Sequence, residues 1–377
     1  MSQRFTIGIE EEYQLVDRTT GQLRPRIEAV LKRGLPIFGE QIKPELHQSM
    51  VEIISGISPD IQAARQEMGT MRANLAHLVA EEGLALISAG SHPTALWWQE
   101  PLSPFERYQR VEEEYQDAVR CELIYGLHVH IGIDSHEMAV ALMNQVRSWL
   151  PHLLALSTNS PFWAGRLTGL KSFRSVIWKT SQRSGIPEYF PSSEDFDSYV
   201  QTLVQTGCID NGKDIWWDVR PHPFFPTLEF RIFDMPATFD EMIALVALCQ
   251  ALVATLYRNT VQGLTAPILP TRLIEENKWR AMRWGLDADI LDFAQGQRLS
   301  MRQAIKELLD FVDGVLDDLG SRREITSLRA LLTATHGTGA DRQIAVYQQT
   351  HSIDAVLQML MQQTLQGIPM KEAMLTT

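Results

Sequence analysis

Six side chains capable of acid–base or metal chemistry occur in three short segments of the chain. The segments are "TIGIEEEYQLVD" (residues 6–17), "GLHVHIGID" (126–134) and "LEFRIFD" (228–234). The six residues are Glu10, Glu12, His128, His130, Glu229 and Arg231. In each segment two of them stand two positions apart. Carboxylates combined with one or two imidazoles are ligands that suit Mg²⁺ or Mn²⁺ better than a metal that prefers thiolates. The residue types therefore indicate a divalent metal site.

Each segment alternates apolar and polar residues, which is the pattern of a β-strand with one buried face. In the first strand Ile7, Ile9 and Tyr13 share the apolar face, and Glu10 and Glu12 point to the other. If the three strands belong to one sheet, its second face carries the carboxylates and imidazoles. Glu11 falls on the apolar face, where we expect a basic partner or an edge position, because an unpaired buried carboxylate is costly.

A simpler interpretation remains open, because an antiparallel sheet commonly exposes one polar face to water. Each strand taken alone favours that interpretation. The choice of residues argues against it, since like charges facing each other across a sheet are destabilising unless a cation lies between them. A bound divalent cation would make this arrangement tolerable.

Two further glutamates, Glu45 and Glu52, lie in "KPELHQSMVEI", residues 43–53. Their odd spacing would place them on opposite faces of one regular strand. Both can reach the same site only if Glu45 lies in the loop entering the strand or if a bulge intervenes.

The rest of the pattern predicts an α+β fold with a largely antiparallel sheet and helices packed on one face. Residues 58–83 read as a long helix with Ser58 as its N-cap, and residues 214–234 as a hairpin-like pair of strands. We expect one catalytic domain over residues 1–377, rich in strands over 1–238 and mostly helical over 239–377.

Composition excludes several classes of protein. With 34 Lys and Arg against 46 Asp and Glu, the net charge of −12 argues against a nucleic-acid partner. The three cysteines, Cys121, Cys208 and Cys249, are too far apart for a disulfide framework or a thiolate zinc site. We found neither a signal-peptide pattern nor a run of about 18 apolar residues that could span a membrane. The expected location is cytoplasmic, and a homodimer is one open option.

The motifs together resemble the YbdK-type carboxylate–amine ligases, relatives of the glutamate–cysteine ligases. "GIEEEYQLVD", "PELHQSMVEI", "GLHVHIGID", "SPFWAGRLTG", "SFR" and "WWDVRPH…LEFRIFD" occur in that order between about residues 5 and 285. The resemblance implies a glutamine-synthetase-like catalytic sheet that uses ATP and Mg²⁺ or Mn²⁺. It also implies ligation through an acyl phosphate, which an amine then converts to an amide.

The resemblance also implies roles for individual residues. The implied metal ligands are Glu10, Glu12, Glu45, Glu52, His128 and Glu229. His130 would lie near the nucleotide phosphates, and Arg231 would face the transferred phosphoryl group as a catalytic residue together with Glu52. Residues 160–190 could form a basic lid through Arg166, Lys171 and Arg174, with Arg166 and Arg174 binding substrate. An ordinary surface loop is an equally good interpretation of each of these cations.

The leading functional prediction is an ATP-dependent ligase that joins an amino-acid carboxylate to an amine. Glutamate and cysteine are the most conservative pair of substrates, with weak activity expected. Two alternatives stay open: a phosphotransferase of the same fold class, and a non-catalytic sensor that binds metal or nucleotide.

Overall fold

The three predicted strands are neighbours in one seven-stranded sheet. A computed structural model describes residues 4–293 and 295–368. The strand order is β10-β11-β5-β1-β3-β2, with β4 paired to β1, and the neighbouring strands run antiparallel. The strands are β1 (Ile7–Asp17), β2 (Ile42–Pro44), β3 (Met50–Ile54), β4 (Leu84–Ile87), β5 (Gly126–Gly132), β10 (Val219–Pro221) and β11 (Thr227–Asp234). The predicted antiparallel sheet is confirmed.

Helices, 3₁₀ turns and short two-stranded sheets make up the rest of the described fold. The α-helices are α1 (Ile27–Phe38), α2 (Ile61–Glu81), α3 (Glu106–Tyr115), α4 (Asp117–Arg120), α5 (His136–Val146), α6 (Leu150–Ser157), α7 (Arg174–Trp178), α8 (Ser193–Gln205), α9 (Phe239–Val261), α10 (Thr271–Trp284), α11 (Met301–Phe311), α12 (Leu316–Leu319), α13 (Arg322–Leu331), α14 (Gly339–Thr350) and α15 (Ile353–Thr364). The 3₁₀ turns are η1 (Gly39–Gln41), η2 (Trp97–Gln99), η3 (Arg147–Trp149), η4 (Gly212–Asp214), η5 (Gly285–Asp287) and η6 (Asp313–Val315). The short strands are β6 (Phe162–Trp163), β7 (Arg166–Leu167), β8 (Ser184–Gly185), β9 (Trp216–Trp217), β12 (Asp289–Asp292) and β13 (Gln297–Ser300). The hairpin of β12 and β13 lies within the region that was predicted to be mostly helical.

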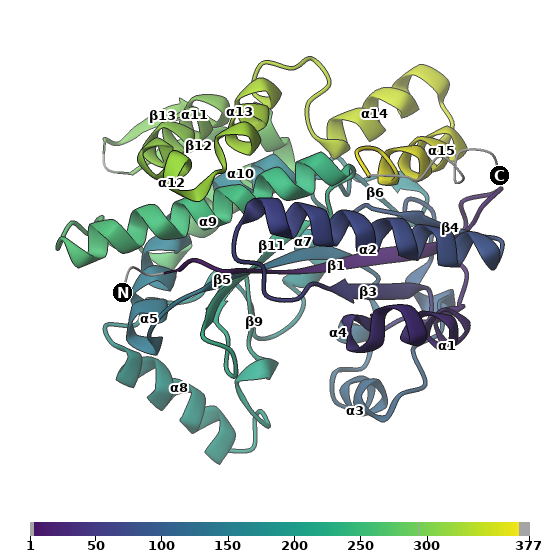
Figure 1. Ribbon diagram of the computed structural model, residues 1–377, viewed down its shortest axis with the longest axis horizontal. Coiled ribbons are helices and arrows are strands. Elements are labelled where there is room, and N and C mark those ends of the chain that lie inside the picture. The colour runs from purple at the N-terminus through teal and green to yellow at the C-terminus, as the bar shows by residue number, and fades with distance from the viewer. Residues whose placement is uncertain (1–3, 294, 369–377) are drawn as a thin grey trace.

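Helices α2 and α9 lie side by side along the apolar face of the sheet (Figure 1). The predicted start of α2 was wrong. Asp60 caps this helix by accepting hydrogen bonds from the amides of Gln62 and Ala63. Ser58 instead exchanges two backbone hydrogen bonds with Ile7, so it extends the sheet and is not available to cap the helix.

Helix α9 is an exception to the prediction that no segment is long and apolar enough to span a membrane. Its length and a mean hydropathy of 1.7 meet the criteria for a membrane span, although 83% of that window is buried inside the protein. The helix packs against α2, α5 and α13. Its apolar composition is therefore explained by its place in the core of the protein. The larger apolar core includes residues from Ile7 to Ile368, so both halves of the chain contribute to it.

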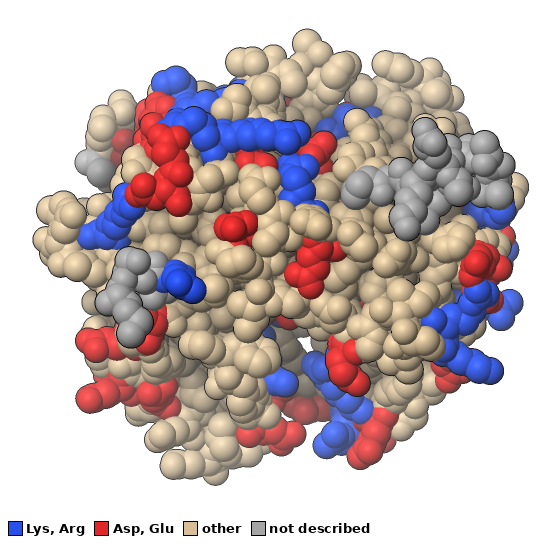
Figure 2. All heavy atoms as spheres, in the orientation of Figure 1, with Lys and Arg blue, Asp and Glu red and all other residues tan. Residues whose placement is uncertain are grey.

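Charges of both signs are interspersed on the face shown in Figure 2. Ion pairs such as those of Arg65 with Asp240 and Arg258 with Asp318 tie basic side chains to acidic neighbours. The same view shows the surface hollowed below the sheet, between the segments that carry α8 and β9 and those that carry α3 and α4.

Candidate active site

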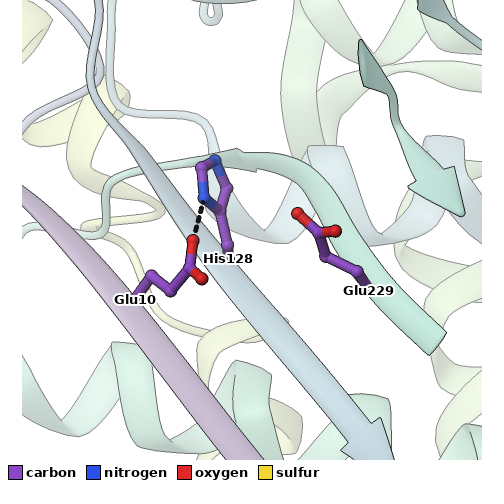
Figure 3. A group of neighbouring side chains, drawn as sticks. All are labelled: Glu10, His128 and Glu229. Carbon is purple, nitrogen blue, oxygen red and sulfur yellow. Dashed lines mark hydrogen bonds and ion pairs between the residues drawn. The ribbon is translucent and has the colours of Figure 1, made fainter. Parts of the chain in front are cut away.

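Glu10, His128 and Glu229 meet on the polar face of the sheet, as the alternation predicted. Glu10 and His128 are directly opposite each other in the pairing of β1 with β5, and Glu229 comes from β11 on the far side of β5. Figure 3 shows the three side chains pointing toward one another, with His128 Nδ1 2.9 Å from Glu10 Oε2. Each residue offers a ligand atom within 4.8 Å of the others' ligand atoms, so the group has the size of a metal site.

A second group of the same kind is formed by Glu12, Glu52 and His128. Glu12 is directly opposite Glu52 in the pairing of β1 with β3, and His128 Nε2 lies 3.8 Å from Glu12 Oε1. The ligand atoms of this group also lie within 4.8 Å of one another. His128 therefore connects two adjacent sets of oxygen and nitrogen donors through its two ring nitrogens.

Glu45 reaches the site from the loop between β2 and β3, whereas Glu52 lies on β3 itself. Strand β2 pairs with β3 so that Lys43 is opposite Glu52, and Glu45 follows directly after β2. The alternative in which Glu45 lies in the loop entering the second strand is therefore the correct one. Burial, followed by the charge of Glu12, raises the pKa of Glu45 to about 8.

The carboxylates differ in their electrostatic surroundings. Burial raises the pKa of Glu52 well above its usual range, and the charges of Glu10, Glu45 and Glu12 raise it further. Burial alone would also raise the pKa of Glu10. Hydrogen bonds to His128 and His130 outweigh burial and hold the pKa of Glu10 well below its usual range. Within the described residues Glu45 and Glu52 have no hydrogen bond to an imidazole, so burial and the neighbouring carboxylates dominate their pKa values.

His130 and Thr227 mark the end of the polar face near the β10–β11 hairpin. His130 Nε2 lies 3.2 Å from Glu10 Oε1, and its Nδ1 lies 3.1 Å from Thr227 Oγ1. Both ring nitrogens therefore have protein partners, which fixes the orientation of the ring.

Two arginines bracket Glu229. Arg231 Nη1 lies 2.5 Å from Glu229 Oε1, and Arg220 Nε lies 2.8 Å from Glu229 Oε2. Burial would raise the pKa of Glu229, but Arg220 and Arg231 hold it far below its usual range. The sequence reasoning missed Arg220, although the predicted hairpin carried a signal for it. In that hairpin Arg220 is directly opposite Glu229 across the proline-rich turn.

Of the three cations in the predicted lid, the structure brings Arg174 to this cluster. Arg174 Nη2 donates to the carbonyl oxygen of Arg231 at 3.2 Å. Lys171 forms ion pairs elsewhere, with Asp287 and Asp341. Arg166 lies exposed in the β6–β7 hairpin, and its role in binding substrate stays a prediction.

Trp178, which the sequence reasoning also missed as a site residue, lies against both guanidinium groups. The Cζ atoms of Arg174 and Arg231 are 5.5 and 5.3 Å from the centroid of its ring. The Nε atoms of both arginines and Nε1 of Trp178 are buried and make no hydrogen bond within the described residues. This arrangement presents donors and positive charge, which suits a carboxylate or a phosphate.

Comparisons with known proteins agree with this geometry. Glutamate-cysteine ligase family 2 matches the chain over residues 6–359. A protein of Chloroflexus aurantiacus named "Putative glutamate--cysteine ligase 2" is 48% identical over 365 residues, which cover 97% of this chain and 93% of that protein. A protein of the same name from Roseiflexus sp. is 48% identical over 369 residues, covering 98% and 97%.

Two solved structures share the fold at low sequence identity. Glutamate–cysteine ligase from Francisella tularensis, solved in complex with AMP, superposes with a TM-score of 0.74 at 12% identity, covering 98% of this chain and 90% of that one. A bifunctional glutathione synthetase from Pasteurella multocida gives a TM-score of 0.71 at 14% identity, covering 96% and 52%. The family match and the alignments with the two relatives all extend over almost the whole sequence. This chain therefore belongs to glutamate-cysteine ligase family 2.

Proposed function

We propose that the protein is an ATP-dependent carboxylate–amine ligase that forms an amide bond through an acyl phosphate. Family membership supports this proposal, as does the set of glutamate, histidine and arginine side chains on the polar face of the sheet. The proposed substrates are an amino-acid carboxylate and an amine. Glutamate and cysteine are the first pair to test, with weak activity expected.

The donor sets fit Mg²⁺ or Mn²⁺. Glu10, His128 and Glu229 would hold one ion, and Glu12 and Glu52, with Glu45 beside them, would offer carboxylate oxygens to a second. Hard carboxylate oxygens with one imidazole nitrogen are ligands that these ions accept. Such ions neutralise the negative charge on the phosphate oxygens of a nucleoside triphosphate. The raised pKa of Glu52 suits a group that gives up a proton when a cation binds.

The arginines supply the fixed positive charge that phosphoryl transfer requires. In the first step a carboxylate oxygen of the substrate bonds to the γ-phosphorus of ATP, and the bond from that phosphorus to the leaving oxygen of ADP breaks. Arg231, held by Glu229 and Trp178, would stabilise the negative charge on the transferred group, with Arg174 beside it. His130 is proposed to contact the phosphates.

In the second step the amine nitrogen bonds to the acyl carbon, and the carbon–oxygen bond to phosphate breaks. Phosphate leaves with the electron pair, and the amine loses a proton. An acyl phosphate hydrolyses if water reaches it, so the site must exclude water during this step. Burial of His128, Glu52 and Glu229 is consistent with that requirement.

The observation that carries the proposal is the pairing of Glu12 with Glu52 on adjacent strands around His128. Like-charged residues in this position are destabilising unless a cation binds between them. The test supplies ATP, Mg²⁺, glutamate and cysteine separately and together, and measures ADP, free phosphate and the mass of the product. A ligase releases phosphate only when both amino acids are present, and it yields a dipeptide.

The same assay separates the alternatives. A phosphotransferase would accumulate a phosphorylated product without the amine, and a sensor would bind nucleotide without turnover. Glu10→Gln and Arg231→Ala should each reduce turnover by at least about 100-fold, in line with loss of a group that stabilises charge in the transition state. Arg33→Ala, at a half-exposed ion pair on α1, is the control and should leave turnover unchanged.

A further inference from the structure

Part of the segment that was predicted to form a basic lid is a loop whose two ends are bound to one buried carboxylate. Asp234, the last residue of β11, has no exposed surface. Its Oδ2 accepts hydrogen bonds from the backbone amide of Asn159 at 2.8 Å and from the hydroxyl group of Ser160 at 2.6 Å. Its Oδ1 accepts a hydrogen bond from the hydroxyl group of Ser172 at 2.7 Å. The loop of residues 160–172 therefore begins and ends on the same side chain.

A bulge in β11 directs Asp234 to the polar face of the sheet. The register of β11 on β5 shifts between Phe230 and Phe233, so β11 carries one extra residue at that point. Regular alternation would place Asp234 on the same face as Phe230. The extra residue turns its side chain to the face of its partner Gly126, which is also the face of His128. The bulge therefore brings this carboxylate to the face that carries the candidate active site.

Arg174 is the charged group that this carboxylate holds. The amide of Arg174 donates to Ser160 Oγ at 3.0 Å, so one hydroxyl group joins its backbone to Asp234. Burial raises the pKa of Asp234, and the charge of Arg174 is the strongest of the effects that oppose burial. Burial likewise lowers the pKa of Arg174, and the charge of Asp234 is the strongest of the effects that oppose it. Each group is therefore the principal counter-charge of the other.

The side chain of Arg174 reaches the candidate active site across a glycine. A Cβ atom at Gly126 would lie 2.5 Å from Arg174 Nη2, so any other residue there would displace the guanidinium group. The amide of Gly126 donates to Glu12 Oε2 at 2.5 Å. Arg174 Nη2 itself donates to the carbonyl oxygen of Arg231. The guanidinium group thus adjoins an implied metal ligand, through Gly126, and the arginine proposed to stabilise the transferred phosphoryl group.

Asp234 is closely packed as well as hydrogen-bonded. A Cβ atom at Gly90 would lie 2.7 Å from Asp234 Cγ, so this position requires a residue without a side chain. Gly90 is itself held by two backbone hydrogen bonds, one donated to Asn159 and one accepted from Tyr125. The carboxylate is therefore fixed by its surroundings, and it can fix Arg174 in turn.

We propose that Asp234 is the positioning residue that holds the guanidinium group of Arg174 in the candidate active site. This inference rests on the proposed function, because it gives Arg174 a part in the reaction. Through Ser160 the carboxylate fixes the backbone of Arg174, and its charge orients the side chain. A misplacement of about 1 Å can slow an enzyme about 100-fold, so a residue that does not touch the substrate can still set the rate.

The first test is a double-mutant cycle in the ligase assay. Asp234→Asn keeps the size of the side chain and removes its charge, and we expect it to lower kcat by about tenfold. Arg174→Ala should lower kcat at least as much. If Asp234 acts through Arg174, adding Asp234→Asn to Arg174→Ala should lower kcat by no more than about a further twofold. Binding of Mg²⁺–ADP, measured by calorimetry, should be unchanged in both single variants, since ADP lacks the transferred phosphoryl group.

Two further variants disturb this arrangement without changing the charge of Asp234. Ser160→Ala removes the hydroxyl group that lies between the carboxylate and the amide of Arg174. Gly90→Ala places a methyl group against the carboxylate. Both should lower kcat, and they keep the test decisive if Asp234→Asn does not fold.

Each of these variants has a matched control. Ser157→Ala removes another buried hydroxyl group, which donates to the carbonyl oxygen of Leu154 within its own helix. Gly314→Ala adds a methyl group where a Cβ atom would meet nothing within 4 Å. Neither control should alter kcat.

Hydrogen exchange supplies a readout that does not depend on turnover. The amide of Arg174 is bonded to Ser160 and that of Asn159 to Asp234, so both amides should be protected in wild type. In Asp234→Asn both should exchange at least about tenfold faster, whereas the amides of the core helix α9 should be unaffected. Mass spectrometry of the peptides that cover residues 159–174 measures the exchange.

Three outcomes would overturn the inference. The first is an unchanged kcat in Asp234→Asn with only a lower thermal midpoint, which would assign Asp234 to packing. The second is a further loss of about tenfold when Asp234→Asn is added to Arg174→Ala, which would mean that the two residues act independently. The third is unchanged exchange of the amides of Asn159 and Arg174. If wild type releases no phosphate with glutamate and cysteine, the proposed function fails, whereas the exchange result still decides whether Asp234 holds Arg174.

Discussion

Glu11 and Arg72 form an ion pair with no exposed surface, between the apolar face of β1 and the helix α2 that covers it. Tyr13 donates a hydrogen bond of 2.6 Å to the same carboxylate. This pairing explains how the central glutamate of an acidic triplet can lie on the buried face of a strand. Within the triplet, Glu11 therefore lies in the core, and its two neighbours face the candidate active site.

We predict that Glu11→Ala lowers the free energy of unfolding by about 3–5 kcal/mol. The reason is that Arg72 would be left buried without its counter-charge. The double variant Glu11→Leu with Arg72→Met, which replaces the pair by apolar side chains, should recover most of this loss. Urea unfolding followed by circular dichroism measures both.

The control for this prediction is Glu82→Gln, which breaks a half-exposed pair with Arg33. It should cost less than about 1 kcal/mol. A double variant at positions 11 and 72 that is no more stable than Glu11→Ala would contradict the explanation.

Glu52→Gln should have opposite effects on the stability of the metal-free protein and on its stabilisation by added metal. Burial and the charges of Glu10, Glu45 and Glu12 raise the pKa of Glu52 in the folded state. Metal-free wild type should therefore lose stability as pH rises from the unfolded value of about 4.5 through the raised pKa. The variant should escape that loss and be at least as stable as wild type in metal-free buffer. Thermal unfolding from pH 5 to 9 measures the difference.

Added Mg²⁺ or Mn²⁺ should raise the thermal midpoint of wild type and should raise it much less in Glu52→Gln. Glu40→Gln, at an exposed carboxylate paired with Lys43, should respond to metal as wild type does. The metal assignment would be wrong if both variants responded equally.

Residue alternation predicted the shared polar face because it depends only on the local period of a strand. Glu10, His128 and Glu229 could be grouped in this way once their segments were identified as strands. That the strands are adjacent was an assumption, which the pairing of β1, β5 and β11 confirms. The family resemblance added the implied roles, which the geometry alone does not supply.

Features that depend on distant parts of the chain could not be predicted. Glu45 reaches the site through the register of β2 on β3, and Arg72 reaches Glu11 from a helix 61 residues further along. The N-cap at Ser58 was a local prediction that failed because pairing with Ile7 involves the same residue. In each case a tertiary contact decided the outcome.

His92 should make stability depend on pH in the acidic range. Its Nε2 donates to the carbonyl oxygen of Gly21 at 2.8 Å, and its Nδ1 accepts from the amides of Thr94 and Ala95. Burial lowers the pKa of His92 to about 4, so the folded state holds the ring neutral. Because the unfolded state gains its proton near pH 6.5, stability is full above that pH and is lost as pH falls toward 4.

At pH 5 this linkage costs wild type about 2 kcal/mol relative to pH 8. Between pH 8 and pH 5 the free energy of unfolding of His92→Gln should therefore fall by about 2 kcal/mol less than that of wild type. Urea unfolding at pH 5 and pH 8 measures it, and the titration of the His92 ring by NMR gives an independent value. The range above pH 7.5 is an internal control, since His92 is neutral there in both states. An identical pH dependence in the two proteins would exclude His92 as the cause.

Trp178 should act as a positioning residue for Arg231 and Arg174. Its ring lies within 5.5 Å of both guanidinium groups, and each such contact is worth about 0.5–2 kcal/mol. Trp178→Leu should lower kcat in the ligase assay by about tenfold, because Arg231 would lose the surface that orients it toward the reacting phosphoryl group. Trp178→Phe keeps an aromatic face and should restore part of the rate. Trp284→Leu removes a comparable contact with Arg283, at 5.4 Å on α10, and should leave kcat unchanged. If Trp178→Leu altered only the thermal midpoint and not kcat, the ring would serve packing, and the orientation of Arg231 would have to depend on Glu229 alone.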